Sequence, residues 1–152
     1  MRPMVRWTLL STLLNLVWEV GQVPLYTLWT ERDAKGIALA IAHCTLGDML
    51  VAGGTFLVAA VVTRSWNWSR SRPGMGAAIA IPTGIAYTAF SEWWNVSVVR
   101  AWAYAESMPQ VFGIGLSPLL QWLVVPLLAL ALLRAMDKRV VVKGQAVPSD
   151  AA

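Results

Sequence analysis

The sequence predicts an all-α fold, an integral membrane bundle of four transmembrane helices whose amino and carboxyl termini both lie in the cytoplasm. Of the 152 residues, 57% are hydrophobic and only 13% are charged, whereas average soluble domains have about 45–50% and about 25%. A helix needs roughly 20 mostly apolar residues to cross a bilayer. Four stretches, at about 7–29, 37–62, 76–98 and 116–134, meet this requirement. They fill most of residues 1–136, which we therefore interpret as one four-helix transmembrane domain.

The basic residues are distributed unevenly between the two sides that such a bundle would have. With the amino terminus inside, nine fall on the inner side and three on the outer side. Cytoplasmic loops carry an excess of Lys and Arg, so this bias predicts cytoplasmic termini in the inner (plasma) membrane. Anionic lipid headgroups then explain the net charge of +4, and no nucleic-acid partner is expected. The inner set is Arg2, Arg6, Arg64, Arg70, Arg72, Arg134, Lys138, Arg139 and Lys143, and the outer set is Arg32, Lys35 and Arg100.

The first stretch, 7–29, has one feature of a signal peptide, because Arg2 precedes its apolar run. The run is too long for that assignment, Asn15 and Glu19 interrupt it, and no small-residue cleavage site follows. We therefore expect a retained helix. Pro24 near its outer end predicts a kink or a partial unwinding there.

The second helix, at 37–62, and the third, at 76–98, are separated by a polar, Arg-rich link that indicates a cytoplasmic turn. The second helix carries Gly47, Gly53 and Gly54. Small residues let membrane helices approach closely, so we expect this helix to pack tightly against its neighbours.

The outer connection, 100–115, is too amphipathic for a plain solvent loop. It is expected to lie in the membrane interface or to cap a cavity between the helices. The fourth helix, at 116–134, returns to the inner side. The charged segment 137–152 has no apolar periodicity and is predicted to be a disordered cytoplasmic tail.

The nine tryptophans divide into two groups by predicted depth. Those at the predicted membrane boundaries are interpreted as interfacial anchors, as in aromatic belts: Trp7, Trp29, Trp66, Trp68 and Trp102. The deeper ones are better candidates for lining a site: Trp18, Trp93, Trp94 and Trp122.

Ionisable residues at membrane depth are the strongest functional indication in the sequence. Each costs about 2.5–3.5 kcal/mol at the centre of a spanning helix, so such residues usually face the bundle interior and take part in function. The candidate catalytic residues are Glu19, His43, Asp48 and Glu92. All lie in the middle or the outer half of their helices, so a cavity that they line should open outward.

Polar and aromatic residues at matching positions predict a binding site around these groups. Asn15, Glu19, Gln22 and Tyr26 recur at helical spacing and share one face of the first helix. The candidate substrate-binding residues are Asn15, Gln22, Trp93, Asn95, Trp102, Tyr104 and Gln121. A structural alternative stays open, in which the amides hydrogen-bond neighbouring helices and the carboxylates pair with His43 and Arg100.

No metal and no cofactor are predicted. Cys44 is the only cysteine, which excludes an internal disulfide and a cysteine-based zinc cage within one chain. His43 has no second histidine or carboxylate in register to complete a ligand set.

Several short motifs resemble those of small bacterial four-helix membrane proteins. They are Trp102-x-Tyr104 with Met108-Pro109, then Gly113-x-Gly115-Leu116-x-Pro118 with Leu120-Gln121, a His43-x4-Asp48 element with Gly47, and Asn15, Gln22 and Pro24-Leu25-Tyr26. The resemblance covers most of the chain but brings no established activity. A looser, architectural resemblance is to the emopamil-binding type of membrane isomerase, although the motif spacings do not align. It implies an enzyme that handles a hydrophobic substrate.

Three functions are compatible with these observations. The first is an intramembrane acid–base enzyme, of isomerase or cyclase type, acting on an isoprenoid or another hydrophobic substrate. The second is a noncatalytic assembly or accessory subunit of a membrane complex. The third is a subunit of a small cation or proton transporter. The expected partners are a membrane lipid or hydrophobic small molecule, and a second copy of the chain or another membrane protein.

Overall fold

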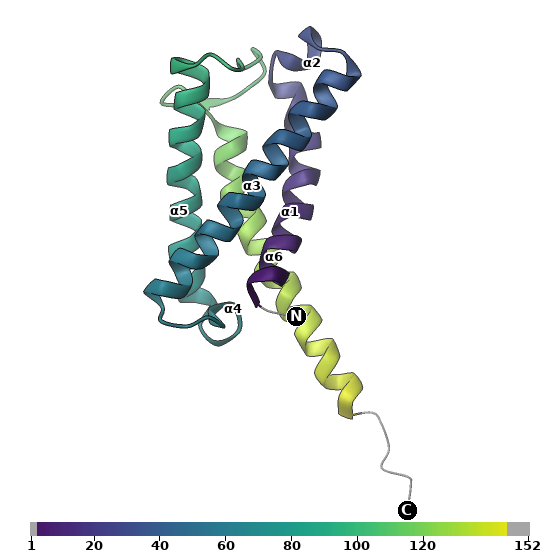
Figure 1. Cartoon of the computed structure of the whole chain (residues 1–152), viewed down its shortest axis with the longest axis vertical. Helices are drawn as coiled ribbons and strands as arrows, with labels where there is room; N and C mark the ends of the chain where they lie inside the picture. The colour runs from purple at the N-terminus through teal and green to yellow at the C-terminus, as the bar shows by residue number, and fades with distance from the viewer. Residues whose placement is uncertain (1–2, 146–152) are drawn as a thin grey trace, which may run out of the picture.

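Four long helices packed in a ring form the molecule (Figure 1). The computed structural model describes the backbone of residues 3–145 and the side chains of residues 3–138. The long helices are α1 (Pro3–Gln22), α3 (Ala34–Val62), α5 (Pro73–Trp93) and α6 (Leu116–Gln145). Each packs against two others, in the cyclic order α1, α3, α5, α6. The all-α bundle is therefore confirmed, and two of its helices, Ala34–Val62 and Leu116–Lys138, are long and apolar enough to cross a membrane.

Short elements connect the helices at both ends of the bundle. At the end away from the amino terminus lie η1 (Val23–Leu25), α2 (Leu28–Glu31), the π-helical turn η2 (Trp94–Val98) and a hairpin of β1 (Gln110–Val111) and β2 (Ile114–Gly115). The backbone of the outer connection bonds to the segment after α1, through Thr27 N to Ala103 O (3.0 Å) and Ala105 N to Leu25 O (3.0 Å). This connection therefore covers that end of the bundle. At the other end, α4 (Trp68–Ser71) joins α3 to α5.

The ends of the helices differ from the predicted ones for local reasons. α1 ends at Gln22 rather than near 29 because Pro24, which lacks an N–H, lies inside the 3-10 turn that follows. α3 begins earlier than predicted because Asp33 caps it, accepting a hydrogen bond from Gly36 N (2.8 Å). α6 continues through Gln145, so the segment predicted to be disordered from 137 begins as helix, and 146–152 lie outside the described residues.

An aromatic core fills the end of the bundle that holds the amino terminus. Trp7, Phe56 and Trp68 are fully buried there, and the Trp7 and Trp68 rings meet edge to face at 5.1 Å. Trp7 Nε1 donates to Ala52 O (3.0 Å) and Trp68 Nε1 donates to Phe56 O (3.2 Å). The interpretation of Trp7 and Trp68 as interfacial anchors is therefore wrong, because both rings are buried and both ring N–H groups are hydrogen-bonded inside the protein.

An ion cluster joins three segments beside this core. The Asp137 carboxylate on α6 accepts from Arg6 Nη1 of α1 at 2.7 Å. It also accepts two bonds of 2.7 Å from Arg70 of α4, through Nε and Nη2. Such a bidentate pair fixes the relative orientation of the two side chains. The amino-terminal end of the bundle is thus held together by both apolar and ionic contacts.

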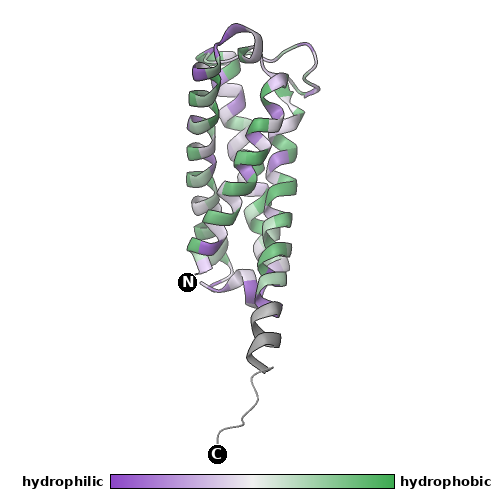
Figure 2. Ribbon diagram, turned by 90° about the vertical axis from the view of Figure 1, so that its right-hand side faces the viewer, coloured by the Kyte–Doolittle hydropathy of each residue, from purple (hydrophilic) through white to green (hydrophobic). Residues whose placement is uncertain are grey.

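The distribution of polarity across α1 is inverted relative to a helix on a water-exposed bundle. The buried face carries Ser11, Asn15, Glu19 and Gln22 in addition to Trp7. The exposed face is apolar, and includes Leu9, Leu13, Val17 and Val20. Exposed large apolar side chains also follow α3, α5 and α6, and Figure 2 shows hydrophobic residues along the whole bundle. In an ordinary globular protein the apolar stripe would instead face the core.

We predict that Gly76→Ala destabilises the protein strongly, whereas Gly74→Ala does not. A Cβ atom at Gly76 would overlap Cε3 of the buried Trp68 ring, while at Gly74 it would meet nothing within 4 Å. Overpacking of this kind costs about 1–3 kcal/mol. Thermal unfolding in detergent, followed by tryptophan fluorescence, measures the difference. Equal midpoints for the two variants would contradict the role of this contact.

Candidate functional site

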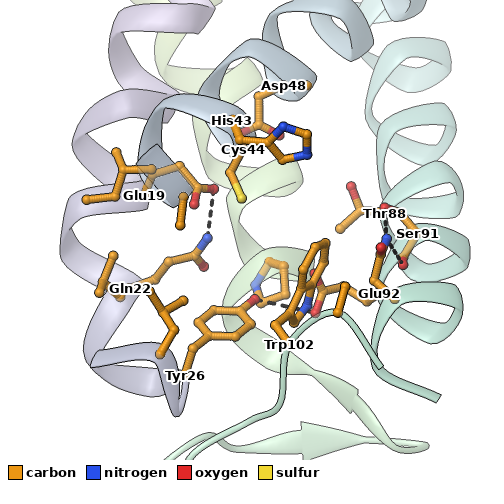
Figure 3. Close-up of a pocket in the computed structure, with 18 of the residues that line it drawn as sticks. Glu19, Gln22, Tyr26, His43, Cys44, Asp48, Thr88, Ser91, Glu92 and Trp102 are labelled. Carbon is orange, nitrogen blue, oxygen red and sulfur yellow. Dashed lines mark hydrogen bonds between the residues drawn. The ribbon is translucent and has the colours of Figure 1, made fainter. Parts of the chain in front are cut away.

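A cavity of about 570 Å³ occupies the half of the bundle opposite the aromatic core. All four long helices and the outer connection contribute to its wall. Figure 3 shows Glu19 and Gln22 on one wall, Glu92 and Ser91 on the facing wall, and Tyr26 and Trp102 at one end. The polar lining is drawn from Glu19, Gln22, Tyr26, Arg32, His43, Cys44, Asp48, Tyr87, Thr88, Ser91, Glu92, Asn95, Trp102 and Gln121.

The first acidic centre joins α1, α3 and α6 through one amide group. Gln121 Nε2 lies 3.2 Å from Glu19 Oε1, 2.8 Å from Asp48 Oδ2 and 3.1 Å from Asn15 Oδ1. Gln22 Nε2 donates to the same Glu19 oxygen at 2.8 Å and lies 3.3 Å from Gln121 Oε1. Two carboxyl groups from different helices thus share one donor.

The hydrogen-bond partners of Gln121 bear on the protonation of this centre. A primary amide has two N–H groups, but three acceptors lie around Gln121 Nε2. No ion pair joins Glu19 or Asp48 to a basic side chain within residues 3–138. Two negative charges this close together in a buried site repel strongly. A proton shared by the Glu19–Asp48 pair would remove one of these charges.

The second acidic centre is Glu92 on α5, and its partners are donors. Tyr104 O–H donates to Glu92 Oε2 at 2.6 Å, and Tyr26 O–H donates to the same oxygen at 3.4 Å. Burial, and next the hydrogen bond to Glu92, raise the pKa of Tyr104, so its hydroxyl remains a donor. Donors stabilise the ionised form of a carboxyl group. Glu92 differs from the Glu19–Asp48 pair in that its donors are tyrosine hydroxyls that no second carboxyl group among the described residues shares.

The structural alternative in which the acids pair with His43 and Arg100 is contradicted. Within the side chains that the structure describes, the ion pairs are those of Arg6 and Arg70 with Asp137. His43 and Arg32 line the cavity, but both are exposed and neither forms an ion pair with a cavity carboxyl group.

Most of the residues predicted for the site come together in this cavity. Eight of the eleven line it: Glu19, Gln22, His43, Asp48, Glu92, Asn95, Trp102 and Gln121. Asn15 and Tyr104 lie just behind the lining, where they hydrogen-bond Gln121 and Glu92.

Trp93 does not belong to the lining. It follows Glu92 by one position, which turns it about 100° around the helix. Its side chain is 48% exposed and packs beside Phe90, with ring centroids 6.0 Å apart. Trp94 is exposed on the same outer surface, so neither of these two tryptophans can act on a molecule in the cavity.

Some residues that line the cavity were not among the candidate site residues predicted from the sequence. Tyr26 could have been included, because it shares a helix face with Glu19 and Gln22 in the sequence. Trp122 was named from the sequence only as one of the deeper tryptophans that could line a site, and it does line the cavity. Ser91 gave no signal, since serines are common in membrane helices at positions without function.

Some buried polar atoms in and near the cavity have no partner. Among the described residues they include Asn15 Nδ2, Thr45 Oγ1 and Trp102 Nε1. Buried polar groups are normally hydrogen-bonded, so open donors beside a cavity are positions where water or a ligand can bind. Within the described part of the chain, no group of three or more His, Cys, Asp or Glu side chains is arranged to hold a metal ion.

No protein-family model, no curated protein and no solved structure matches this chain. The resemblance to small bacterial four-helix membrane proteins, and the looser one to membrane isomerases, therefore stay predictions. The proposed function therefore rests on the residues of the cavity alone.

We predict that Gln121→Met lowers the stability of the protein, because it keeps the length of the side chain but removes the shared donor. The loss of a hydrogen-bond donor to buried carboxyl groups costs about 1–3 kcal/mol. Leu120→Met, at the exposed neighbouring position, is the control. Chemical unfolding in detergent reports both variants, and an unchanged midpoint for Gln121→Met would show that the amide does not hold the centre together.

Proposed function

We propose that this chain is a multi-pass protein of the inner membrane whose four long helices all span the bilayer. The inverted polarity of the bundle carries this proposal. α1 has 20 residues and α5 has 21, so each is about 30 Å long, which matches the hydrocarbon thickness. Their average hydropathy is reduced by the polar side chains on the cavity side, whereas the side chains that would face lipid are apolar.

The orientation follows from the basic residues. Arg6, Arg70 and Lys138 belong to the end of the bundle with the aromatic core, whereas Arg32 and Arg100 belong to the cavity end. Among the described residues, Arg64, Arg72 and Arg134 also belong to the first end, so the positive-inside rule makes it cytoplasmic. The cavity then lies at the level of the outer leaflet.

We predict that outer and inner connections differ in their accessibility from outside the cell. In a Cys44→Ser background, Glu106→Cys should react with a membrane-impermeant maleimide on intact cells, because it lies in the exposed outer connection. Asn67→Cys, in the exposed link between α3 and α5, should react only after permeabilisation. The reverse pattern would contradict the orientation, and equal labelling of both on intact cells would contradict the membrane arrangement.

Within this arrangement, we infer that the chain is an acid–base enzyme that moves a double bond in a hydrophobic substrate. The observation that carries this inference is the difference between the two acidic centres. Glu19 and Asp48 share one donor, which favours a shared proton, whereas Glu92 lies on the facing wall with hydroxyl donors of its own, which favour the carboxylate. Pairs of titratable groups with opposite protonation are the usual basis of acid and base roles.

The reaction follows from these two positions. The Glu19–Asp48 pair adds its proton to one carbon of a carbon–carbon double bond, which leaves a positive charge on the neighbouring carbon. Glu92 then removes a proton from the next carbon, and the electron pair of that C–H bond forms the new double bond. One proton is gained and one is lost, so the substrate is isomerised without a cofactor. The aromatic faces of Tyr26, Trp102 and Trp122 line the cavity and can stabilise the cation.

The cavity has a lateral mouth through which a lipid could enter. Leu39 and His43 of α3 and Tyr87 of α5 line the cavity and are also exposed on the outer surface. The mouth therefore opens at the seam between α3 and α5, toward the surroundings of the bundle. A path through the protein is less compatible with the structure, because the buried core of Trp7, Phe56 and Trp68 fills the other half.

We predict that the protein incorporates solvent deuterium into a membrane lipid. Each turnover adds a proton from the Glu19–Asp48 pair to carbon, and this pair re-equilibrates with solvent. Purified protein is incubated in D₂O with a total bacterial lipid extract, and carbon-bound deuterium is measured by mass spectrometry. Glu92→Gln and Asp48→Asn should each reduce incorporation by about 10²-fold or more, as expected for the loss of an acid or a base.

The matched control is Glu106→Gln, which changes an exposed carboxylate in the outer connection and should incorporate deuterium like the wild type. Folding of each variant is checked by its elution in size-exclusion chromatography. Two results would show that the enzymatic inference is wrong: no incorporation by the wild type into any lipid, or full incorporation by folded Glu92→Gln and Asp48→Asn.

A further inference from the structure

Four buried polar atoms on α1 and α3, which pack against each other, form no hydrogen bond within the described part of the chain. They are Thr8 Oγ1, Ser11 Oγ, Asn15 Nδ2 and Thr45 Oγ1. Ser11 and Asn15 are almost completely buried, at 2% and 1% exposed. Buried polar groups are normally hydrogen-bonded, either to protein or to ordered water, so four open groups on two adjacent helices indicate a bound molecule between them.

The three hydroxyl groups in this set behave differently from other hydroxyl groups of the bundle. Four threonines in or next to the long helices donate to a carbonyl oxygen three or four residues earlier, at 2.7–3.1 Å: Thr12, Thr55, Thr63 and Thr83. Thr8, Ser11 and Thr45 do not, although each follows a helical carbonyl group by four residues. Their hydroxyl groups are therefore free to bond to a molecule between the helices.

These open groups lie next to the first acidic centre. Asn15 Oδ1 and Asp48 Oδ2 both accept from the same nitrogen, Nε2 of Gln121. Ser11 precedes Asn15 by four residues and Thr45 precedes Asp48 by three, so each lies one helical turn away on the same face. The Asn15 amide thus has its oxygen in the acidic centre, while both N–H groups of its Nδ2 are left without an acceptor.

The packing between α1 and α3 also leaves room for a small molecule. Gly53 of α3 is buried, and a Cβ atom added to it would have Met4 Cε at 3.7 Å and Thr8 Oγ1 at 3.9 Å as its nearest neighbours. Both are ordinary van der Waals distances, so the side-chain position of this glycine is not filled by a neighbour. Water bound inside a protein needs about 2–4 polar partners, which the four open groups supply.

We propose that internal water molecules lie between α1 and α3 and bond to Thr8, Ser11, Asn15 and Thr45, behind the wall of the cavity. Water suits these groups because it both donates and accepts, as hydroxyl and amide groups require, and because the room left by a glycine suits only a small molecule. The site is distinct from the cavity, since none of the four residues belongs to the cavity lining.

The position of this water gives it a role at the acidic centre. A hydrophobic substrate that fills the cavity displaces the water there, but the internal water beside Asn15 remains. The proton shared by Glu19 and Asp48 then exchanges with this water while a substrate is bound, so the hydrogen added to carbon comes from solvent. This role deepens the proposed function and rests on it, whereas the water site itself does not.

Crystallography of the full-length protein in a lipid phase tests the site directly, at a resolution that shows ordered water. We expect water within hydrogen-bond distance of Asn15 Nδ2 and of a hydroxyl group of Ser11 or Thr45. A dry interface, in which these atoms bond to protein groups or stay unpaired, would overturn the proposal.

The stability of Thr45→Val distinguishes a hydrated from a dry interface without a crystal. Valine keeps the shape of threonine but has no hydroxyl group. If Thr45 Oγ1 bonds to water, its loss should lower the unfolding midpoint by about 2–4 °C, whereas in a dry interface the loss of an unsatisfied polar group would raise the midpoint. Thr12→Val is the matched control, because the Thr12 hydroxyl bonds within its own helix. A midpoint that is higher in Thr45→Val than in the wild type would overturn the proposal.

Deuterium incorporation separates the water from the enzymatic reaction. In D₂O with saturating lipid, Thr45→Val should lower the deuterium content of the converted lipid at least twofold relative to Thr12→Val, because the proton removed by Glu92 can then return to the product. Equal deuterium content in the two variants would overturn the role of the water at the acidic centre. Ordered water without any incorporation by the wild type would overturn only the enzymatic reaction, and incorporation by a protein with a dry interface would overturn only the water site.

Discussion

The amide of Gln121 is the interaction on which the cavity half of the structure depends. It connects α6 to Glu19 of α1 and to Asp48 of α3. Without a shared donor and a shared proton, the buried Glu19 and the half-buried Asp48 would repel each other as carboxylates and push their helices apart. Because the described part of the chain offers no ion pair to either acid, hydrogen bonds from neutral amides hold the two groups together. In the proposed reaction, the same arrangement that lets the helices meet supplies the acid.

The half of the bundle with the aromatic core is tightly packed, and it supplies the rigidity that the half with the cavity lacks. Trp68 lies so close to Gly76 that a methyl group at this position has no room, and Asp137 joins two further segments to the same end. A second close contact, between Trp122 and Gly84, lies at the boundary with the cavity. Tight packing at one end fixes the helix directions, and these directions determine the separation of the acidic centres at the other end.

The helices and the acidic residues were predictable because each depends on a local pattern. Apolar length predicted four helices, and helical spacing placed Glu19 and Gln22 on one face. What failed depended on contacts between distant segments. The position of Trp7 in the sequence indicated an interfacial anchor, but its N–H bonds to Ala52 O inside the bundle. A Cβ atom at Gly54 of the small-residue helix would meet nothing, while the tight contact occurs at Gly76, because local sequence does not reveal where a distant ring will pack.

The proposed membrane insertion and the proposed acid–base chemistry depend on the same feature, the exclusion of water from the polar groups. In an aqueous cavity, Glu19, Asp48 and Glu92 would all ionise and would be chemically alike. Behind apolar helix surfaces, the arrangement of the donors separates the carboxyl groups: Glu19 and Asp48 share the amide of Gln121, whereas Glu92 accepts from two tyrosine hydroxyls that no second carboxyl group among the described residues shares. On the proposed function, the exposed apolar side chains are thus part of the site, since they would maintain the difference between its acid and its base.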